Sequence, residues 1–120
     1  MMKEAKILVV DDEQNLRLLI SEELEELGYK VETVSNAEEA LKRIESDDFD
    51  LATIDIEMPG MNGIELAGIL RQKYPALRII LLTAYSHYKY DLASWAADAY
   101  VVKSTDPTEL KETVKKLLQM

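Results

Sequence analysis

Four short apolar runs constrain the fold of this chain more than any other feature. They occupy residues 7–10, 51–54, 79–82 and 100–102, and each is followed at once by a polar or charged residue. Continuous apolar runs of this length are typical of strands buried on both faces of a parallel sheet. A further run at residues 31–34 alternates only in part and carries a charge, which predicts an edge strand.

Helical patterns separate these runs. Asn62, with Glu65 three residues later, predicts a capping box. Pro59-Gly60 just before it predicts a type II turn, and Asp106-Pro107 predicts the N-cap and first residue of a final helix. We predict helices over residues 14–27, 36–44, 62–74, 87–95 and 106–118.

Strands and helices therefore alternate five times along the chain. This order predicts an α/β fold in which a parallel sheet is doubly wound between two layers of helices, with right-handed crossovers. The chain has 120 residues, which is the size of one domain. Neither an internal repeat nor a linker interrupts the pattern.

Composition narrows the classes of function. A net charge of -9 argues against direct binding to nucleic acid or to an anionic membrane. The absence of cysteine excludes disulfides and thiol catalysis. No apolar run approaches the ~18 residues of a membrane span, and the start of the chain lacks the apolar region of a signal peptide. We therefore expect a soluble cytoplasmic protein.

The residues that follow the strands share a chemistry. Because the carboxyl ends of parallel strands meet at one edge of a sheet, five side chains should lie close together there. They are Asp11, Asp12, Asp55, Thr83 and Lys103. One explanation is that these are ordinary capping carboxylates and a surface lysine, but five residues of matching chemistry make that explanation poor.

Three clustered carboxylates favour a bound cation, because the cation relieves their mutual repulsion. Oxygen ligands alone suggest Mg²⁺ or Mn²⁺. A metal beside a lysine suits phosphoryl chemistry, in which cations already in place neutralise the charge of the transferred group. A carboxylate can also be the nucleophile and form an aspartyl phosphate. Asp55 is the candidate, because it lies centrally among the strand ends.

The motifs at these strand ends resemble the receiver domain of two-component response regulators. They are residues 9–13, Asp55 with residues 58–63, residues 82–84 and residues 97–103. The resemblance covers essentially the whole chain. It implies a flavodoxin-like (βα)5 sandwich with a five-stranded parallel sheet in the order 2-1-3-4-5. It also implies a single receiver domain over residues 1–120, either stand-alone or the N-terminal part of a larger regulator.

The resemblance implies a role for each acidic residue. Asp55 is expected to accept a phosphoryl group from a phosphohistidine of a sensor histidine kinase or a phosphotransfer protein. Magnesium (or manganese) is expected at the same place, with Asp12 as a direct ligand and Asp11 acting through water. Asp55 itself and the backbone carbonyl of Glu57 complete the expected metal ligands.

The resemblance also implies a switch. Thr83 is expected to hydrogen-bond the phosphoryl group, Lys103 to form an ion pair with it, and Tyr100 to move with Thr83. The surface altered would comprise the fourth helix, the last strand and the fifth helix, with Tyr88 and Trp95 as contact residues. An output domain, an effector protein or a phosphorylation-dependent homodimer would bind there.

A different surface is expected to meet the kinase. Asn15, Leu18 and Glu22 lie on the outer face of the first predicted helix, which flanks the acceptor and docks the kinase in the resembling family.

The residue after Lys103 departs from the family pattern, because Ser104 stands where proline is usual. A cis bond before serine is costly, so we expect a trans bond or local strain.

Two alternatives use the same residues differently. The first is a Mg²⁺-dependent phosphohydrolase, since residues 55–57 resemble an Asp-x-Asp motif, although 120 residues leave little room for a substrate pocket. The second is a pseudo-receiver that only binds proteins, which the complete set of Asp12, Asp55, Thr83 and Lys103 argues against. We expect a signalling switch and not an enzyme with a diffusible substrate, although it catalyses its own phosphotransfer and slow autodephosphorylation.

Overall fold

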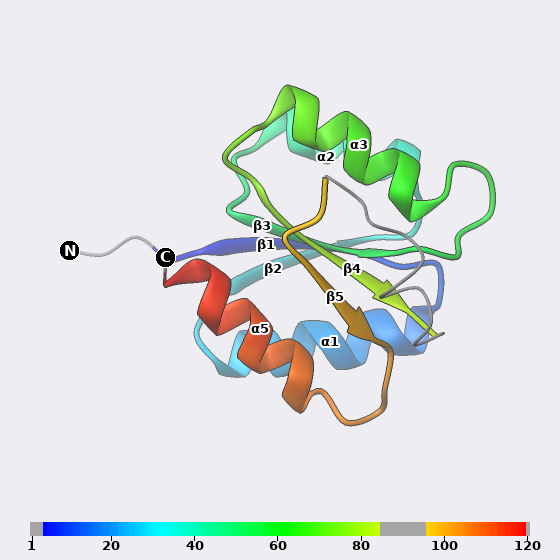
Figure 1. The fold of residues 1–120 in the computed structure, drawn as a ribbon. Helices are drawn as coiled ribbons and strands as arrows, with labels where there is room; N and C mark the ends of the chain where they lie inside the picture. The colour runs from blue at the N-terminus through cyan, green and yellow to red at the C-terminus, as the bar shows by residue number, and fades with distance from the viewer. Residues whose placement is uncertain (1–3, 85–95, 120) are drawn as a thin grey trace.

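A five-stranded parallel sheet forms the centre of the structure, a computed structural model that describes residues 4–84 and 96–119 (Figure 1). The strands lie in the order β2-β1-β3-β4-β5, as predicted, so that β2 and β5 are the edges. All neighbouring strands are parallel. The strands are β1 (Lys6–Val10), β2 (Lys30–Val34), β3 (Leu51–Asp55), β4 (Arg78–Thr83) and β5 (Ala99–Val102).

Helices cover both faces of this sheet. On one face lie α2 (Ala37–Ser46) and α3 (Gly63–Lys73), and on the other lie α1 (Gln14–Glu26) and α5 (Thr108–Leu118) (Figure 1). This is the predicted doubly wound arrangement. The helix predicted over residues 87–95 lies outside the described residues. Within residues 4–84 and 96–119, no helix has both the length and the apolar character needed to cross a membrane.

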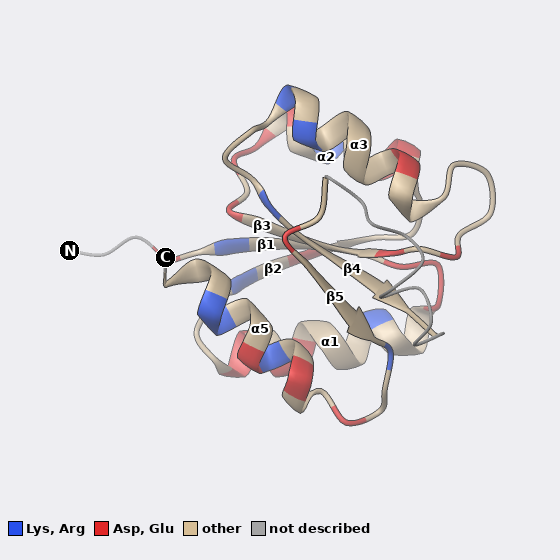
Figure 2. Cartoon of the chain, in the orientation of Figure 1, with Lys and Arg blue, Asp and Glu red and all other residues tan. Residues whose placement is uncertain are grey.

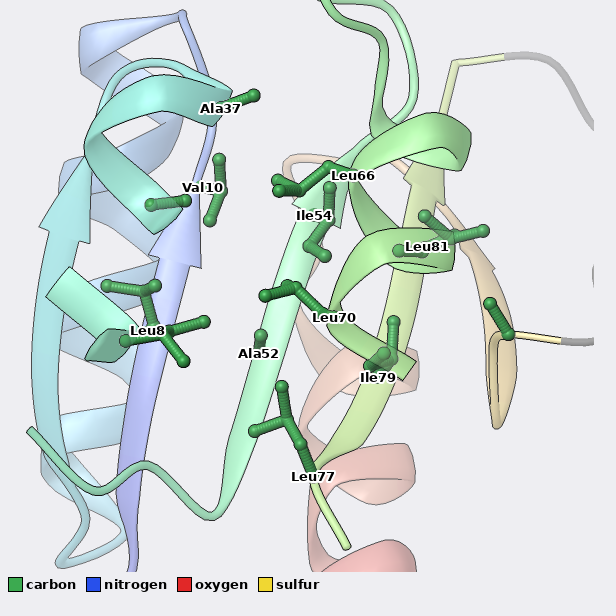
Figure 3. Packing of buried hydrophobic residues seen from close by; sticks show 14 of the residues in the cluster. Leu8, Val10, Ala37, Ala52, Ile54, Leu66, Leu70, Leu77, Ile79 and Leu81 are labelled. Carbon is green, nitrogen blue, oxygen red and sulfur yellow. The ribbon is translucent and has the colours of Figure 1, made fainter. Parts of the chain in front are cut away.

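The strands supply two apolar clusters, because successive residues of a strand point to opposite faces of the sheet. Leu8 and Val10 belong to the cluster beneath α2 and α3, whereas Ile7 and Val9 belong to the cluster beneath α1 and α5. Figure 3 shows the first cluster, where leucines of α3 lie over β3 and β4. The middle of the sheet is therefore apolar on both faces except for the buried Thr53, and the strand ends are where polar groups gather.

Local signals set the loop after β3. Gly60 has a φ of 77°, which is the left-handed conformation that the third residue of a type II turn requires. The Asn62 side chain accepts the Glu65 backbone N–H at 2.9 Å, and the Glu65 side chain accepts the Asn62 N–H at 3.4 Å. The predicted capping box is thus present, and it fixes the start of α3 close to the end of β3.

The start of α5 differs slightly from the prediction. Pro107, not Asp106, is the N-cap residue, and the helix begins at Thr108. The Asp106 carboxylate nevertheless accepts the Thr108 backbone N–H at 3.0 Å and its hydroxyl at 2.6 Å. Asp106 therefore satisfies a helix-terminal amide from one residue further out than a standard N-cap.

Candidate functional site

The strand ends bring polar residues together at one edge of the sheet. Asp11 directly follows β1, Asp55 ends β3, Thr83 ends β4 and Lys103 directly follows β5. The pairing of Val10 with Ile54 and of Asp55 with Leu82 keeps these ends level. Figure 2 shows acidic segments at this edge, on the right of the view. The parallel register thus assembles residues that are far apart in the sequence.

Three carboxylates form an acidic cluster at this edge. One oxygen from each of Asp11, Asp12 and Asp55 lies within 4.8 Å of the others. Asp11 and Asp55 are fully buried, whereas Asp12 is exposed. Among the described residues, Asp11 Oδ2 and Asp55 Oδ2 accept no hydrogen bond of good geometry, and both depend on one ammonium group, that of Lys103. A single positive charge does not compensate two buried carboxylates, so the cluster fits a divalent cation that prefers oxygen ligands.

Lys103 completes the charge arrangement. Its Nζ lies 2.9 Å from Asp55 Oδ2 and 3.3 Å from Asp11 Oδ2, so one ammonium group faces both buried carboxylates. The Lys103 backbone N–H donates to the carbonyl of Thr83 at 2.7 Å, which extends the pairing of β5 with β4 to the site itself. The described residues contain no cis peptide bond, so Lys103–Ser104 is trans.

Burial and neighbouring charges set the pKa values of Asp55 and Lys103. It raises the pKa of Asp55 from 3.8 to about 7, and the Asp11 charge adds to the rise while Lys103 opposes it. Burial by itself lowers the pKa of Lys103, but the Asp55 and Asp11 carboxylates outweigh it and leave that pKa above its ordinary value of 10.5. Lys103 therefore stays charged at neutral pH, and a further cation would favour the ionised form of Asp55.

Backbone groups orient the two buried carboxylates. Asp11 Oδ1 accepts the Glu13 N–H at 2.9 Å, and Asp55 Oδ1 accepts the Glu57 N–H at 3.1 Å. Arg17 of α1 donates from Nη1 to the carbonyl oxygen of Asp11 at 2.7 Å. The sequence does not predict this contact of Arg17, because nothing in the helical pattern indicates a contact back to the preceding loop.

Gly63 also positions the site, a role that the sequence pattern did not predict. A Cβ atom at Gly63 would lie 2.2 Å from the carbonyl oxygen of Asp55. The Gly63 N–H donates to the carbonyl of Ile56 at 3.0 Å, which holds α3 against the end of β3. Only glycine allows this close approach. The available signal was a glycine at the start of a helix, a position where it has no intrinsic advantage.

Glu57 reaches across the site to the end of β4. Its Oε2 accepts the Thr83 hydroxyl at 3.2 Å, and its Oε1 accepts the Ala84 backbone N–H at 3.4 Å. The sequence predicted metal ligation by the Glu57 backbone carbonyl, but it did not predict this side-chain contact. The side-chain contact depends on the relative placement of two loops, which the sequence pattern does not specify.

Comparison with known proteins agrees with this arrangement. The family model described as the response regulator receiver domain matches residues 7–115, which is most of the chain. The chain belongs to the response regulator receiver family. Members of this family are generally signalling switches.

Relatives of this receiver include proteins of known structure. TrrA of Thermotoga maritima, crystallised with Mg²⁺-BeF, is 60% identical, with a TM-score of 0.89 over 94% of this chain and 98% of that chain. TrrA in complex with the histidine kinase ThkA matches with 60% identity and a TM-score of 0.88, over 95% of this chain and 98% of that chain.

Curated relatives are longer proteins. The alkaline phosphatase synthesis transcriptional regulatory protein PhoP of Bacillus subtilis is 39% identical over 117 residues, which is 95% of this chain and 48% of PhoP. The transcriptional regulatory protein ResD of the same organism is 38% identical over 97% of this chain and 49% of ResD. The receiver therefore spans about half the length of these curated relatives.

The remaining predicted residues belong either to the predicted switch surface or to α1. Tyr100, on β5, is half-buried and packs against the cluster beneath α2 and α3. Tyr88 and Trp95 lie outside the described residues. On α1, Leu18 is 52% exposed, and no other large apolar side chain is exposed to this degree among the described residues. Its neighbours on the same outer surface, Asn15 and Glu22, are also exposed.

Proposed function

We propose that this receiver accepts a phosphoryl group on Asp55 from a phosphohistidine of a sensor histidine kinase or a phosphotransfer protein, in a reaction that requires Mg²⁺ or Mn²⁺. The observation that carries the proposal is the surroundings of Asp55. Its carboxylate is buried beside Asp11 and Asp12, and the Lys103 ammonium lies 2.9 Å away. A buried carboxylate between two others and a lysine suits an acceptor of a dianionic group.

The transfer exchanges one bond to phosphorus for another. A carboxylate oxygen of Asp55 attacks the phosphorus, and the phosphorus–nitrogen bond breaks with its electron pair passing to the imidazole nitrogen. The products are an aspartyl phosphate and a neutral histidine after proton uptake. Lys103 is already charged and in place, so its ammonium can pair with the phosphoryl oxygens without costly reorganisation. Later attack by water returns the carboxylate and releases inorganic phosphate.

The acidic cluster would hold the metal. Asp12 is the proposed direct ligand, Asp11 the ligand through water, and the Asp55 carboxylate and Glu57 backbone carbonyl complete the set. A bound divalent cation supplies positive charge that neutralises the phosphoryl oxygens. The buried oxygens of Asp11 and Asp55 support this assignment, because the Lys103 ammonium alone faces both of them and leaves their negative charge incompletely compensated.

The signal would leave the site through β4 and β5. We propose that Thr83 bonds the phosphoryl group and that Tyr100 follows its movement. The surface affected comprises β5, α5 and the segment that holds Tyr88 and Trp95. An output domain, an effector or a second receiver would bind there. The transcriptional regulators among the relatives support an output of this general kind.

The kinase would bind at α1, and its phosphohistidine would enter from that side. Exposed Leu18, with Asn15 and Glu22, supplies a partly apolar surface beside the strand ends. The complex of TrrA with ThkA supports a histidine kinase as the partner. The receiver domain would occupy residues 1–120, either as a stand-alone protein or as the N-terminal part of a larger regulator.

Metal binding tests this function separately from signalling. In calorimetry with MgCl₂, Asp12→Asn should bind the metal at least tenfold more weakly than the wild type, because it loses a direct charged ligand. Glu13→Gln, which removes the same charge from the next residue, should bind almost as tightly as the wild type. Equal affinity of wild type and Asp12→Asn would contradict the assignment. A phosphohydrolase would instead hydrolyse small phosphate esters repeatedly without a kinase.

A further inference from the structure

The Glu57 side chain occupies two hydrogen-bond donors at the end of β4. Its two carboxylate oxygens accept the Thr83 hydroxyl at 3.2 Å and the Ala84 backbone N–H at 3.4 Å. Its own backbone N–H donates to Asp55 Oδ1 at 3.1 Å. One residue therefore connects the proposed acceptor to both donors at the end of the neighbouring strand.

A phosphoryl group on Asp55 would need the same kind of donor. It carries a charge of about -1.5 to -2 and three acceptor oxygens, and it bonds best to N–H and O–H groups that face it. The Glu57 carboxylate presents the same chemistry on a smaller scale, with one negative charge and two acceptor oxygens. The Thr83 hydroxyl has one hydrogen to donate, so it cannot give full hydrogen bonds to both anions at once.

We propose that Glu57 is an internal competitor of the phosphoryl group. Its carboxylate holds the Thr83 hydroxyl and the Ala84 amide in the unphosphorylated receiver, and it must release them before a phosphoryl group on Asp55 can bind there. This inference rests on the proposed phosphorylation of Asp55. It assigns Glu57 a positioning role that is separate from metal ligation by its backbone carbonyl.

The charges at the site favour this release. Asp11 and Asp55 are buried, Asp12 lies beside them, and within residues 4–84 and 96–119 only Lys103 forms an ion pair with this cluster. A phosphoryl group adds further negative charge, so the Glu57 carboxylate is repelled when the group arrives. Breaking the Glu57 contacts costs free energy, and this cost reduces the net free energy that phosphorylation contributes to the change of state.

Substitutions at Glu57 separate hydrogen bonding from charge. Glu57→Met keeps the length of the side chain and removes both acceptor oxygens, whereas Glu57→Gln removes the charge and keeps one acceptor oxygen. The control is Glu13→Gln, which removes a charge next to Asp12 from an exposed residue. All three variants keep the backbone carbonyl at position 57.

Affinity for beryllofluoride in the presence of Mg²⁺ is the first measurement. Glu57→Met should bind about tenfold more tightly than the wild type, because two donors become free, and Glu57→Gln should fall between them. Glu13→Gln should stay within about twofold of the wild type. Equal or weaker binding by Glu57→Met, with normal binding by the wild type, would overturn the competition and leave the proposed function intact. If neither protein binds beryllofluoride, the proposed function fails and the competition falls with it.

The amide proton of Ala84 provides the second measurement, and it needs no phosphoryl analogue. In the free wild-type receiver it should resonate downfield of its position in Glu57→Met, because a carboxylate accepts it. Glu13→Gln should leave this resonance in place. An unchanged Ala84 amide resonance in Glu57→Met would show that the contact does not exist in solution, whatever the beryllofluoride affinities are.

Discussion

Ile54 and Asp55 are neighbours on β3 and both are fully buried, yet their surroundings are opposite in kind. Ile54 lies within the apolar cluster beneath α2 and α3, where Leu66 and Leu81 belong to the same cluster (Figure 3). Asp55 lies one residue further on, beside two carboxylates and an ammonium group. The same contrast separates Val10 from Asp11.

The contrast shows how one strand serves two purposes. Its apolar middle stabilises the fold, since each buried aliphatic side chain contributes roughly 1.5–3 kcal/mol. Its polar end reduces stability, because burial of a carboxylate without enough partners is unfavourable. The raised pKa of Asp55 is the electrostatic signature of that cost. The sheet must therefore be stable enough in its middle to tolerate a strained charge arrangement at its edge.

The largest effect is expected in the middle of the sheet. Ile54→Ala should lower the free energy of unfolding by about 3–4 kcal/mol, because it removes a fully buried side chain and leaves a cavity. Urea denaturation at neutral pH measures the loss. A matched change at an exposed aliphatic residue, Leu18→Ala, should cost less than about 0.5 kcal/mol. Similar losses of unfolding free energy for both variants would contradict the claim that the buried middle of β3 stabilises the fold.

Gly63→Ala should disturb the contact between the start of α3 and the polar end of β3. The added methyl group would lie 2.2 Å from the Asp55 carbonyl oxygen, so α3 or the end of β3 must shift. We expect a loss of roughly 2–3 kcal/mol in unfolding free energy, as for other overpacked sites. Gly68→Ala, at a helix position with nothing within 4 Å of an added Cβ, is the control and should be neutral or stabilising. Equal stability of the two variants would contradict the close approach.

Asp55→Asn should raise the free energy of unfolding, whereas Ile54→Ala and Gly63→Ala should lower it. The folded-state pKa of Asp55 is raised from 3.8 to about 7, so its contribution to stability is present below about pH 4 and is lost as the pH rises to about 7. Without metal, the variant should therefore be more stable than the wild type at pH 7.5 by an amount on the order of 2 kcal/mol. The difference should shrink toward pH 4.5. Urea titrations at both pH values measure it, and a variant that is less stable at pH 7.5 would refute the electrostatic cost.

The smallest effect on stability should accompany a clear effect on binding. Leu18→Ala should weaken the association with a cognate histidine kinase by about 5- to 30-fold, since an exposed apolar contact contributes about 1–2 kcal/mol. Glu26→Ala, an exposed change at the other end of α1, should leave the affinity within about twofold. Surface plasmon resonance with the purified kinase measures both. Equal affinities for wild type and Leu18→Ala would exclude this part of α1 from the interface.

Sequence patterns predicted the strands of this fold well, because buried parallel strands are nearly continuous apolar runs. They also predicted the residues at the strand ends, since topology alone brings Asp11, Asp55 and Thr83 to one edge. The order of the strands came from the resemblance to receivers and not from the pattern. The start of α5 was misplaced by one residue, because Asp106 and Pro107 both satisfy the local signals of a helix start.

Contacts between loops could not be predicted in the same way. Arg17 reaches back to the carbonyl of Asp11, Gly63 packs against the carbonyl of Asp55, and Glu57 bonds to Thr83 and Ala84. Each contact depends on side-chain direction or on the distance between two segments. Hydrophobic periodicity carries no information about either quantity, so a structure was needed to find them.

Intact-protein mass spectrometry measures whether a phosphoryl group is added to Asp55. The receiver is incubated with acetyl phosphate, or with a phosphorylated cognate kinase, in the presence and absence of MgCl₂. The wild type and the control Asp48→Asn, changed at an exposed residue before β3, should each gain one phosphoryl group only with the metal. Asp55→Asn should gain none, because an amide is not a nucleophile for this reaction. Undiminished incorporation by Asp55→Asn, or incorporation by the wild type without divalent metal, would contradict the account.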